Sequence, residues 1–156
     1  PAMATLAGPG ALIARRPEEE VPAMVIGGQR PESAVFHRRP GDDYPVFVLR
    51  CAQAVATDEG SLGVVLGGSG NGEQIAANKV PGIRAALCYN DEMASLARQH
   101  NNAQVISIGG RMNTLEEARS MVRTFLATAW SGEDRHQRRI DMLTAYESDR
   151  TLPPLP

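Results

Sequence analysis

The sequence predicts an α/β fold: a three-layer sandwich with a mainly parallel, Rossmann-like central sheet flanked by helices. From about residue 62 onward, short apolar runs alternate with amphipathic segments of helical length. Two of these apolar runs end in glycine pairs, at 67–68 and 109–110, a pattern typical of buried parallel strands. Strands and helices that alternate in this way form right-handed βαβ units, in which helices cover both faces of the sheet.

Each predicted element has a local signal. The strands are continuous apolar runs, the helices have apolar residues on one face, and Thr114 and Glu117 form a T-x-x-E capping box before the longest helical pattern. In order, we expect a helix at 43–56, a strand at 62–68, a short helix at 73–80, a strand at 83–89, a helix at 91–100, a strand at 104–110, a helix that begins after Thr114, and a last helix at 133–146.

The N-terminal third gives a weaker pattern. Strands are expected at 3–7 and 23–26, but the charged and proline-containing segments at 15–20 and 38–41 interrupt the periodicity. The length of 156 residues suits one domain, which we assign to 1–150 with an atypical part at 1–41, followed by a proline-rich tail at 151–156.

The bulk composition excludes several classes of protein. Hydrophobic residues make up 42% and charged residues 22%, the balance of a globular chain, and a net charge of −2 gives no general attraction to nucleic acid or anionic membrane. No apolar run approaches the roughly 20 residues of a membrane span, and no secretion signal is recognisable. Cys51 and Cys88 are expected to be reduced thiols of a cytoplasmic protein.

A glycine-rich loop follows the first strand of the alternating region. It carries four glycines in the six positions 67–72, directly before a predicted helix. Glycines let backbone N–H groups face an incoming oxygen, and the helix adds its own unpaired N–H groups. The loop therefore predicts a cradle for an anion or an oxyanion, and the alternative is a tight turn with no ligand. The sequence matches neither the P-loop nor the dinucleotide-binding pattern.

Two side chains in this loop could take part in chemistry. Glu73 opens the helix beside the cradle, where a carboxylate can act as a general base or can simply complement the helix dipole. Ser69 has no histidine near it in the sequence, so we expect its hydroxyl to bind substrate rather than to act as a nucleophile.

Further polar residues lie later in the chain. His100 and Asn101 close a helix, where they either serve as capping residues or contact a ligand. Arg135 and Arg139 lie at i and i+4 on one helix face, so their guanidinium groups could converge on a phosphate or could form a solvated basic face. Arg111 follows the third strand, where ligands of parallel sheets bind.

Three motifs in the expected order carry a resemblance to a known family. They are GSLGVVLGGSGNGEQIAANKVPGIRAAL, ARQHNNAQVISIGGRM and RHQRRIDML, preceded by Asp42-Asp43-Tyr44-Pro45. Together they closely resemble the type B ribose-5-phosphate isomerases in their actinobacterial form, over about residues 42–147. The family also includes related isomerases that act on six-carbon sugar phosphates.

The resemblance implies a role for each candidate residue. Glu73 would move a proton between C1 and C2 through an enediolate, which other branches achieve with a cysteine at the position of Ser69. His100 would assist opening of the furanose ring. The remaining residues would bind substrate: Gly68, Ser69, Gly70, Asn71 and Gly72 around the enediolate oxygens, Asn101 at a hydroxyl, Arg111, Arg135 and Arg139 at the phosphate, and Tyr44 in the first matched motif.

The resemblance also implies an assembly and a reaction. Family members build the site between two subunits, which implies a homodimer with shared active sites and no metal or organic cofactor. The expected reaction is the interconversion of ribose 5-phosphate and ribulose 5-phosphate. The alternatives are isomerisation of another phosphorylated aldose with four or six carbons, and a non-catalytic protein that binds a phosphorylated sugar.

The first strand departs from the family pattern. Family members carry an Asp-His-Ala-Gly motif there, whose first two residues contact sugar and phosphate, but this chain has Pro9-Gly10 where that pair would fall. The spacing to Asp42 still fits the family. This departure supports the non-catalytic alternative, whereas Glu73 and its loop support the enzyme.

Overall fold

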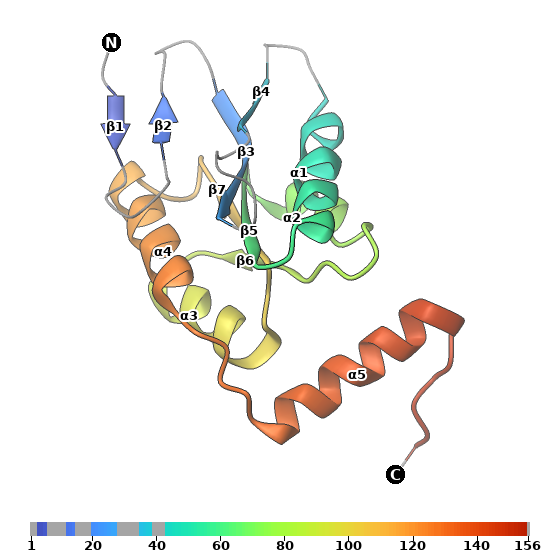
Figure 1. Cartoon of the computed structure of the whole chain (residues 1–156). Helices are drawn as coiled ribbons and strands as arrows, with labels where there is room; N and C mark the ends of the chain where they lie inside the picture. The colour runs from blue at the N-terminus through green and yellow to red at the C-terminus, as the bar shows by residue number, and fades with distance from the viewer. Residues whose placement is uncertain (1–2, 6–11, 15–19, 28–34, 39–42, 156) are drawn as a thin grey trace.

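The protein is a three-layer α/β sandwich, as expected (Figure 1). The computed structural model describes residues 3–5, 12–14, 20–27, 35–38 and 43–155, with side chains described over 43–155. The main sheet has the strand order β4-β3-β5-β7-β6. Its strands are β3 (Glu20–Gly27), β4 (Val35–Arg38), β5 (Ser61–Gly67), β6 (Ala85–Cys88) and β7 (Val105–Gly109).

The part of the sheet that positions the site is parallel. β7 lies between β5 and β6 and runs parallel to both. The N-terminal strands add antiparallel pairs: β3 pairs with β5, and β4 pairs with β3. A separate antiparallel pair is formed by β1 (Met3–Thr5) and β2 (Leu12–Ala14). The strand expected at 23–26 lies within β3, and residues 3–5 of the strand expected at 3–7 form β1, whereas residues 6–11, which include Pro9 and Gly10, lie outside the described residues.

Helices cover both faces of the sheet. α1 (Pro45–Thr57) and α2 (Asn71–Ala77) pack on one face, and α3 (Asp91–Asn101) and α4 (Leu115–Ala127) pack on the other. Successive residues of β5 alternate between the two cores, because Val64 faces α3 and α4 while Val65 faces α1 and α2. All five residues of β7 are buried, as expected for the central strand of a sheet covered on both sides.

The ends of the helices follow from their capping residues. The Asn90 side chain accepts a hydrogen bond of 2.8 Å from the Met93 amide at the start of α3. α3 ends at Asn102, whose φ of 43° is the left-handed conformation that asparagine tolerates. The predicted capping box is present at α4, where the Glu117 carboxylate accepts the Thr114 amide at 2.7 Å.

Some boundaries and one burial assignment differ from the prediction. α2 spans Asn71–Ala77. It begins earlier than expected because Gly70 caps its start, so the loop before it is shorter than predicted. Leu115, which the helical pattern puts on the apolar face of α4, is 45% exposed, because it lies at the first residue of the helix.

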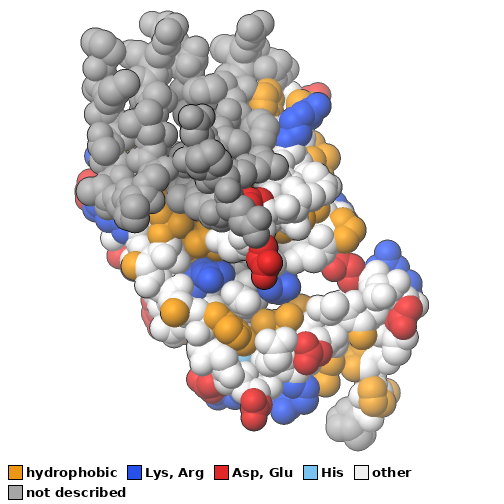
Figure 2. Space-filling model, viewed as in Figure 1, with side chains coloured by type: hydrophobic (Ala, Val, Ile, Leu, Met, Phe, Trp, Pro, Cys, Tyr) orange, Lys and Arg blue, Asp and Glu red, His pale blue; other side chains and the backbone are white. Residues whose placement is uncertain are grey.

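α5 (Asp134–Asp149) projects away from the rest of the molecule (Figure 1). A notch separates its outer part from the sheet and helices (Figure 2), where a cavity of about 140 Å³ lies between α5 and the turn after α2. One contact across this notch is a hydrogen bond of 2.7 Å from the Gly82 amide to the Glu147 carboxylate. Met142, Leu143 and Tyr146 leave 41%, 61% and 44% of their surfaces exposed along α5. Among the described helices, none is long and apolar enough to cross a membrane.

Candidate functional site

The glycine-rich loop lies where β5 and β7 end side by side. Gly67, the last residue of β5, is the register partner of Gly109, the last residue of β7. Beyond them, the Gly110 amide donates to the Gly67 carbonyl at 2.7 Å and the Arg111 amide donates to the Gly68 carbonyl at 3.0 Å. The two chain segments that leave the strands are therefore tied together by their backbones.

Glu73 is buried against this junction. Its side chain is 6% exposed, and a Cβ atom at Gly67 would overlap its carboxylate. The carboxylate therefore reaches back over the end of β5 because position 67 has no side chain. As the third residue of α2, Glu73 also lies at the positive end of the helix dipole. The result is a carboxylate that is held beside the loop and shielded from water.

The turn into α2 depends on Gly70. This residue has φ of 80°, in the left-handed region that favours glycine, and its carbonyl accepts the Gln74 amide at 3.0 Å. A second hydrogen bond to the same carbonyl comes from the Ser107 hydroxyl at 2.8 Å. Ser107 is fully buried in β7, so the hydroxyl has a fixed position from which it orients the turn.

Ser69 lies directly before Gly70, the residue that caps the short helix. Its hydroxyl oxygen accepts hydrogen bonds of 3.3 Å from both the backbone amide and the side-chain amide of Asn71. The next two amides of the first turn, those of Gly72 and Glu73, have no intrahelical acceptor and are available to a ligand oxygen. Ser69 itself is exposed, so its hydroxyl is open to a ligand as well.

Two longer side chains border the loop. The Arg111 guanidinium lies over Gly68, where a Cβ atom would overlap it. The Tyr44 ring lies against Gly72, and a Cβ atom there would be 2.7 Å from the phenol oxygen. The structure therefore brings together one group of predicted site residues: Tyr44, Gly68, Ser69, Gly70, Asn71, Gly72, Glu73 and Arg111.

The remaining predicted residues form a second group at the start of α5. The ring of His100, near the end of α3, stacks on the ring of His136 with centroids 4.2 Å apart and planes 15° apart. Arg135 and Arg139 are exposed on the same helix as His136, and the Arg135 guanidinium pairs with Glu133 at 2.8 Å. Asn101 follows His100 and is also exposed.

The two groups lie at opposite ends of the parallel strands. α3 begins after the carboxyl end of β6 and runs back to the amino end of β7, so an 11-residue helix, about 16 Å long, separates its two ends. At the amino ends, the Asn101 carbonyl accepts a hydrogen bond of 2.7 Å from Arg84, whose amide in turn donates to Gln104. A single chain therefore does not surround one small sugar with all the predicted residues.

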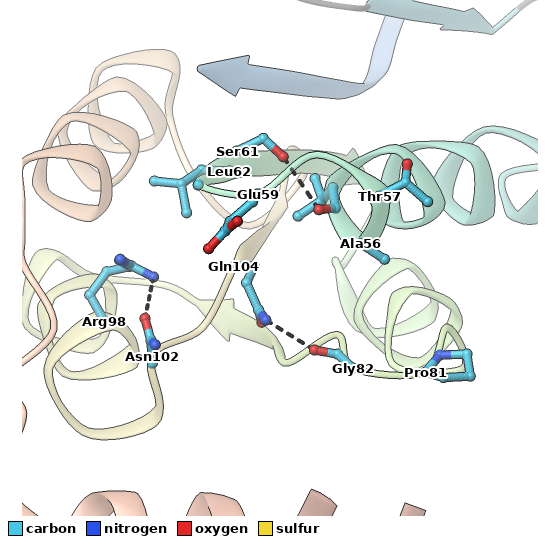
Figure 3. Close-up of a pocket in the computed structure, with 12 residues that line it drawn as sticks. Ala56, Thr57, Glu59, Ser61, Leu62, Pro81, Gly82, Arg98, Asn102 and Gln104 are labelled. Carbon is cyan, nitrogen blue, oxygen red and sulfur yellow. Dashed lines mark hydrogen bonds between the residues drawn. The ribbon is translucent and has the colours of Figure 1, made fainter. Parts of the chain in front are cut away.

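A cavity of about 450 Å³ also lies at the amino ends of the strands (Figure 3). None of the predicted site residues lines it. Its polar side chains bond to neighbouring groups in the same wall: Gln104 donates to the Gly82 carbonyl at 2.9 Å, and Arg98 donates to the Asn102 side chain at 3.1 Å. This cavity is therefore separate from the glycine-rich loop.

Two residues that shape these groups were missed in the sequence. Ser107 is a lone hydroxyl within the apolar strand VISIG, which was a signal that it must hydrogen-bond inside the protein. His136 is buried together with Ile140, four residues later, so helical spacing could have identified it as an inward-facing residue. No group of three or more His, Cys, Asp or Glu side chains suited to a metal ion occurs among the residues that the structure describes.

Comparisons with known proteins agree with this architecture. The chain matches the Ribose/Galactose Isomerase family over residues 28–143. It is 59% identical to ribose-5-phosphate isomerase B of Mycobacterium tuberculosis (strain H37Rv) over 115 residues, which cover 74% of this chain and 71% of that protein. It is 42% identical to the Escherichia coli (strain K12) enzyme of the same name, over 69% of this chain and 72% of that protein.

Solved structures give the same result. The type B ribose 5-phosphate isomerase of Trypanosoma cruzi superposes with a TM-score of 0.67 at 48% identity, covering 69% of this chain and 71% of that one. Ribose-5-phosphate isomerase B of Mycoplasma genitalium, solved with bound ribulose-5-phosphate, gives a TM-score of 0.66 at 41% identity, covering 70% and 72%.

The fold is thus that of a sugar isomerase, and the chain belongs to the ribose/galactose isomerase family. Within that family, all four of these relatives are ribose-5-phosphate isomerases of type B.

The contact between Gly67 and Glu73 can be tested by adding one methyl group. In Gly67→Ala the new Cβ atom must displace the Glu73 carboxylate, so isomerase activity should fall by about 100-fold or more, since small misplacements of reacting groups have effects of that size. The measurement is steady-state turnover together with thermal unfolding by circular dichroism.

Gly110→Ala is the matched control, because its Cβ atom would meet only the Gly67 carbonyl oxygen at an ordinary 3.5 Å. Normal activity in Gly67→Ala would show that the carboxylate does not depend on this contact.

Proposed function

We propose that this protein interconverts D-ribose 5-phosphate and D-ribulose 5-phosphate by proton transfer through an enediolate. The observation that carries the proposal is the buried Glu73 carboxylate at the mouth of the glycine-rich loop, in a chain that belongs to this isomerase family. A carboxylate beside N–H donors provides both groups that enolisation needs, a base and a site for the developing oxyanion.

The reaction follows from these positions. Glu73 takes the proton from C2 of the open-chain aldose while the carbonyl oxygen at C1 gains negative charge. The amides at the start of α2 donate hydrogen bonds to this oxygen, as an oxyanion hole does. A proton then passes from the hydroxyl on C2 to the oxygen on C1. Glu73 returns its own proton to C1, and the carbonyl forms at C2. Because the carboxylate is buried, water is kept from protonating the enediolate before Glu73 does.

The second group of residues serves the other parts of the substrate in this proposal. Before enolisation the furanose ring must open, which removes a proton from the hydroxyl on C1 and adds one to the ring oxygen. His100 is the side chain of this group that can carry such a proton at neutral pH, and Asn101 beside it can bind a hydroxyl. Arg135 and Arg139 supply positive charge for the phosphate, together with Arg111 from the loop.

We also propose that the enzyme is a homodimer with two composite sites. The separation of the two groups within one chain supports this arrangement, because a second copy can bring its His100 and α5 arginines to the first copy's loop. The exposed apolar side chains of α5 and its few contacts with its own chain also favour a partner along this helix.

The cysteines suit a cytoplasmic enzyme, which is our proposal for its compartment. Cys51 and Cys88 are buried in separate core clusters, on opposite faces of the sheet. Burial raises the pKa of Cys88 to about 12, so that its thiol stays protonated and unreactive.

The role of Glu73 as the base is tested by Glu73→Gln. This change keeps the shape and hydrogen bonding of the side chain but removes the proton acceptor, so kcat should fall by roughly 10²–10⁴-fold while substrate still binds. Ribulose 5-phosphate formation by the purified protein is the assay. Near-normal kcat in Glu73→Gln, together with loss of activity in Ser69→Ala, would show that Glu73 is not the base.

The phosphate contacts are tested on α5. Replacing Arg135 or Arg139 with alanine should weaken binding of ribose 5-phosphate by about 1.5–3 kcal/mol, the scale of a charge-assisted hydrogen bond. Turnover of unphosphorylated ribose should hardly change. Arg138→Ala is the matched comparison, since Arg138 is also exposed on α5 but is not one of the two arginines assigned to the phosphate. Equal losses on both substrates would contradict the assignment.

The composite site is tested by mixing two inactive variants, Glu73→Gln and His100→Ala. In a heterodimer one site carries both changes and the other carries neither, so activity should reappear after subunit exchange and approach a quarter of the wild-type value at equal mixing. Sedimentation should show a dimer at micromolar concentration. A monomer, or a mixture that remains inactive after exchange, would contradict the shared site.

A further inference from the structure

His136 is a buried histidine that has no role in the reaction described above. It is 3% exposed, and its Nε2 atom has no hydrogen-bond partner among the described residues. The nearest acceptor is the Glu133 carboxylate at 3.9 Å, too far for a hydrogen bond. A polar ring that is buried without full hydrogen bonding is unusual enough to require an explanation.

Ring contacts hold His136 in place. One face stacks on His100 at 4.2 Å, and Trp130 and His136 make an edge-to-face contact with ring centroids 6.2 Å apart and planes 64° apart. His100 comes from the end of α3 and His136 from the first turn of α5, so the stack joins two helices. The plane of the His100 ring is thereby set by a residue that comes from another helix.

Ring orientation matters for what His100 does in the proposed function. An imidazole exchanges protons through its ring nitrogens, in the plane of the ring, so the plane decides which oxygen of the sugar it can reach. His100 is only partly buried and lies in the last turn of α3. A neighbouring ring stacked within 15° of parallel restricts its orientation.

We propose that His136 is a positioning residue for His100: its buried ring stacks on the His100 imidazole and directs the ring nitrogens of His100 toward the sugar ring oxygen during ring opening. This inference rests on the proposed function. It assigns to His136 no contact with the substrate, and it concerns only the ring-opening step.

The charges around the pair favour a neutral His136. The pKa of His136 lies below its ordinary value, chiefly because burial disfavours its charged form, and His100, Arg135 and Arg139 act in the same direction. Glu133 acts in the opposite direction. A neutral His136 therefore presents no positive charge to the His100 ring that stacks on it.

The experiment separates ring opening from enolisation. Ribulose 5-phosphate cannot close to a furanose, because its O5 carries the phosphate, so exchange of its C1 hydrogen with solvent deuterium reports enolisation without ring opening. In His136→Ala, kcat for ribose 5-phosphate should fall by about 10–100-fold, the scale of a misplaced catalytic group. Exchange into ribulose 5-phosphate should change by less than about threefold.

His136→Phe keeps a flat ring that can stack but cannot carry a proton, so it should restore most of the turnover of ribose 5-phosphate at pH 7.5. Gln137→Ala is the matched control on α5, since Gln137 is exposed and hydrogen-bonds only within its own helix to Asp141. Circular dichroism and sedimentation of each variant test that fold and assembly are unchanged.

A stability measurement tests the neutral state of His136 independently. Because its folded pKa is lower than its unfolded value of about 6.5, the unfolded chain binds more protons below that pH, and acidification destabilises the fold. The Tm of the wild type should therefore fall more between pH 7.5 and pH 5.5 than the Tm of His136→Phe.

The outcomes are distinguishable. Equal losses of turnover and exchange in a folded His136→Ala, no recovery in His136→Phe, or a comparable loss in Gln137→Ala would each overturn the positioning role. If the wild type itself neither turns over ribose 5-phosphate nor exchanges ribulose 5-phosphate, the proposed function is wrong, and the inference about His136 is overturned with it.

Discussion

The site depends on the close pairing of two strands that both end in glycine. Because Gly67 and Gly109 face each other without side chains, the segments that follow can bond to one another and the Glu73 carboxylate can fold back onto the end of β5. The Ser107 hydroxyl then orients the turn at Gly70, so the start of α2 is also set by β7. The Glu73 carboxylate, the amides at the start of α2 and the bordering Arg111 therefore all take their positions from one parallel strand pair.

The same parallel topology separates the other candidate residues from this loop. A helix that follows a parallel strand must return to the opposite end of the sheet, so residues at its C-terminus cannot lie near the loops at the carboxyl ends. His100 is such a residue, and α5 continues outward from that side rather than returning across the sheet. Within one chain the two groups of candidate residues therefore lie at opposite ends of the parallel strands, which supports the proposed homodimer.

Local patterns predicted the elements well, but they did not predict contacts between distant parts of the chain. The apolar runs of β5 and β7, the Thr114 capping box and the Glu73 loop each have a signal within a few residues, and each is present. The structure starts α2 two residues before the predicted start at Glu73, because Gly70 serves as its cap. The Gly70 carbonyl accepts a hydrogen bond from the Ser107 hydroxyl, 37 residues away in the sequence. The stack of His100 on His136 was likewise not predictable, because nothing in either segment specifies that the two helices meet.

The way in which the turn is held has a consequence for how the loop can vary. Backbone bonds from Gly110 and Arg111 and the hydroxyl of Ser107 determine its path, whereas the Ser69 side chain is exposed and makes only the two long hydrogen bonds to Asn71. Position 69 therefore contributes little to the shape of the loop that carries it. A thiol in place of the hydroxyl at position 69 would therefore leave the path of the loop, and the place of the Glu73 carboxylate beside it, unchanged.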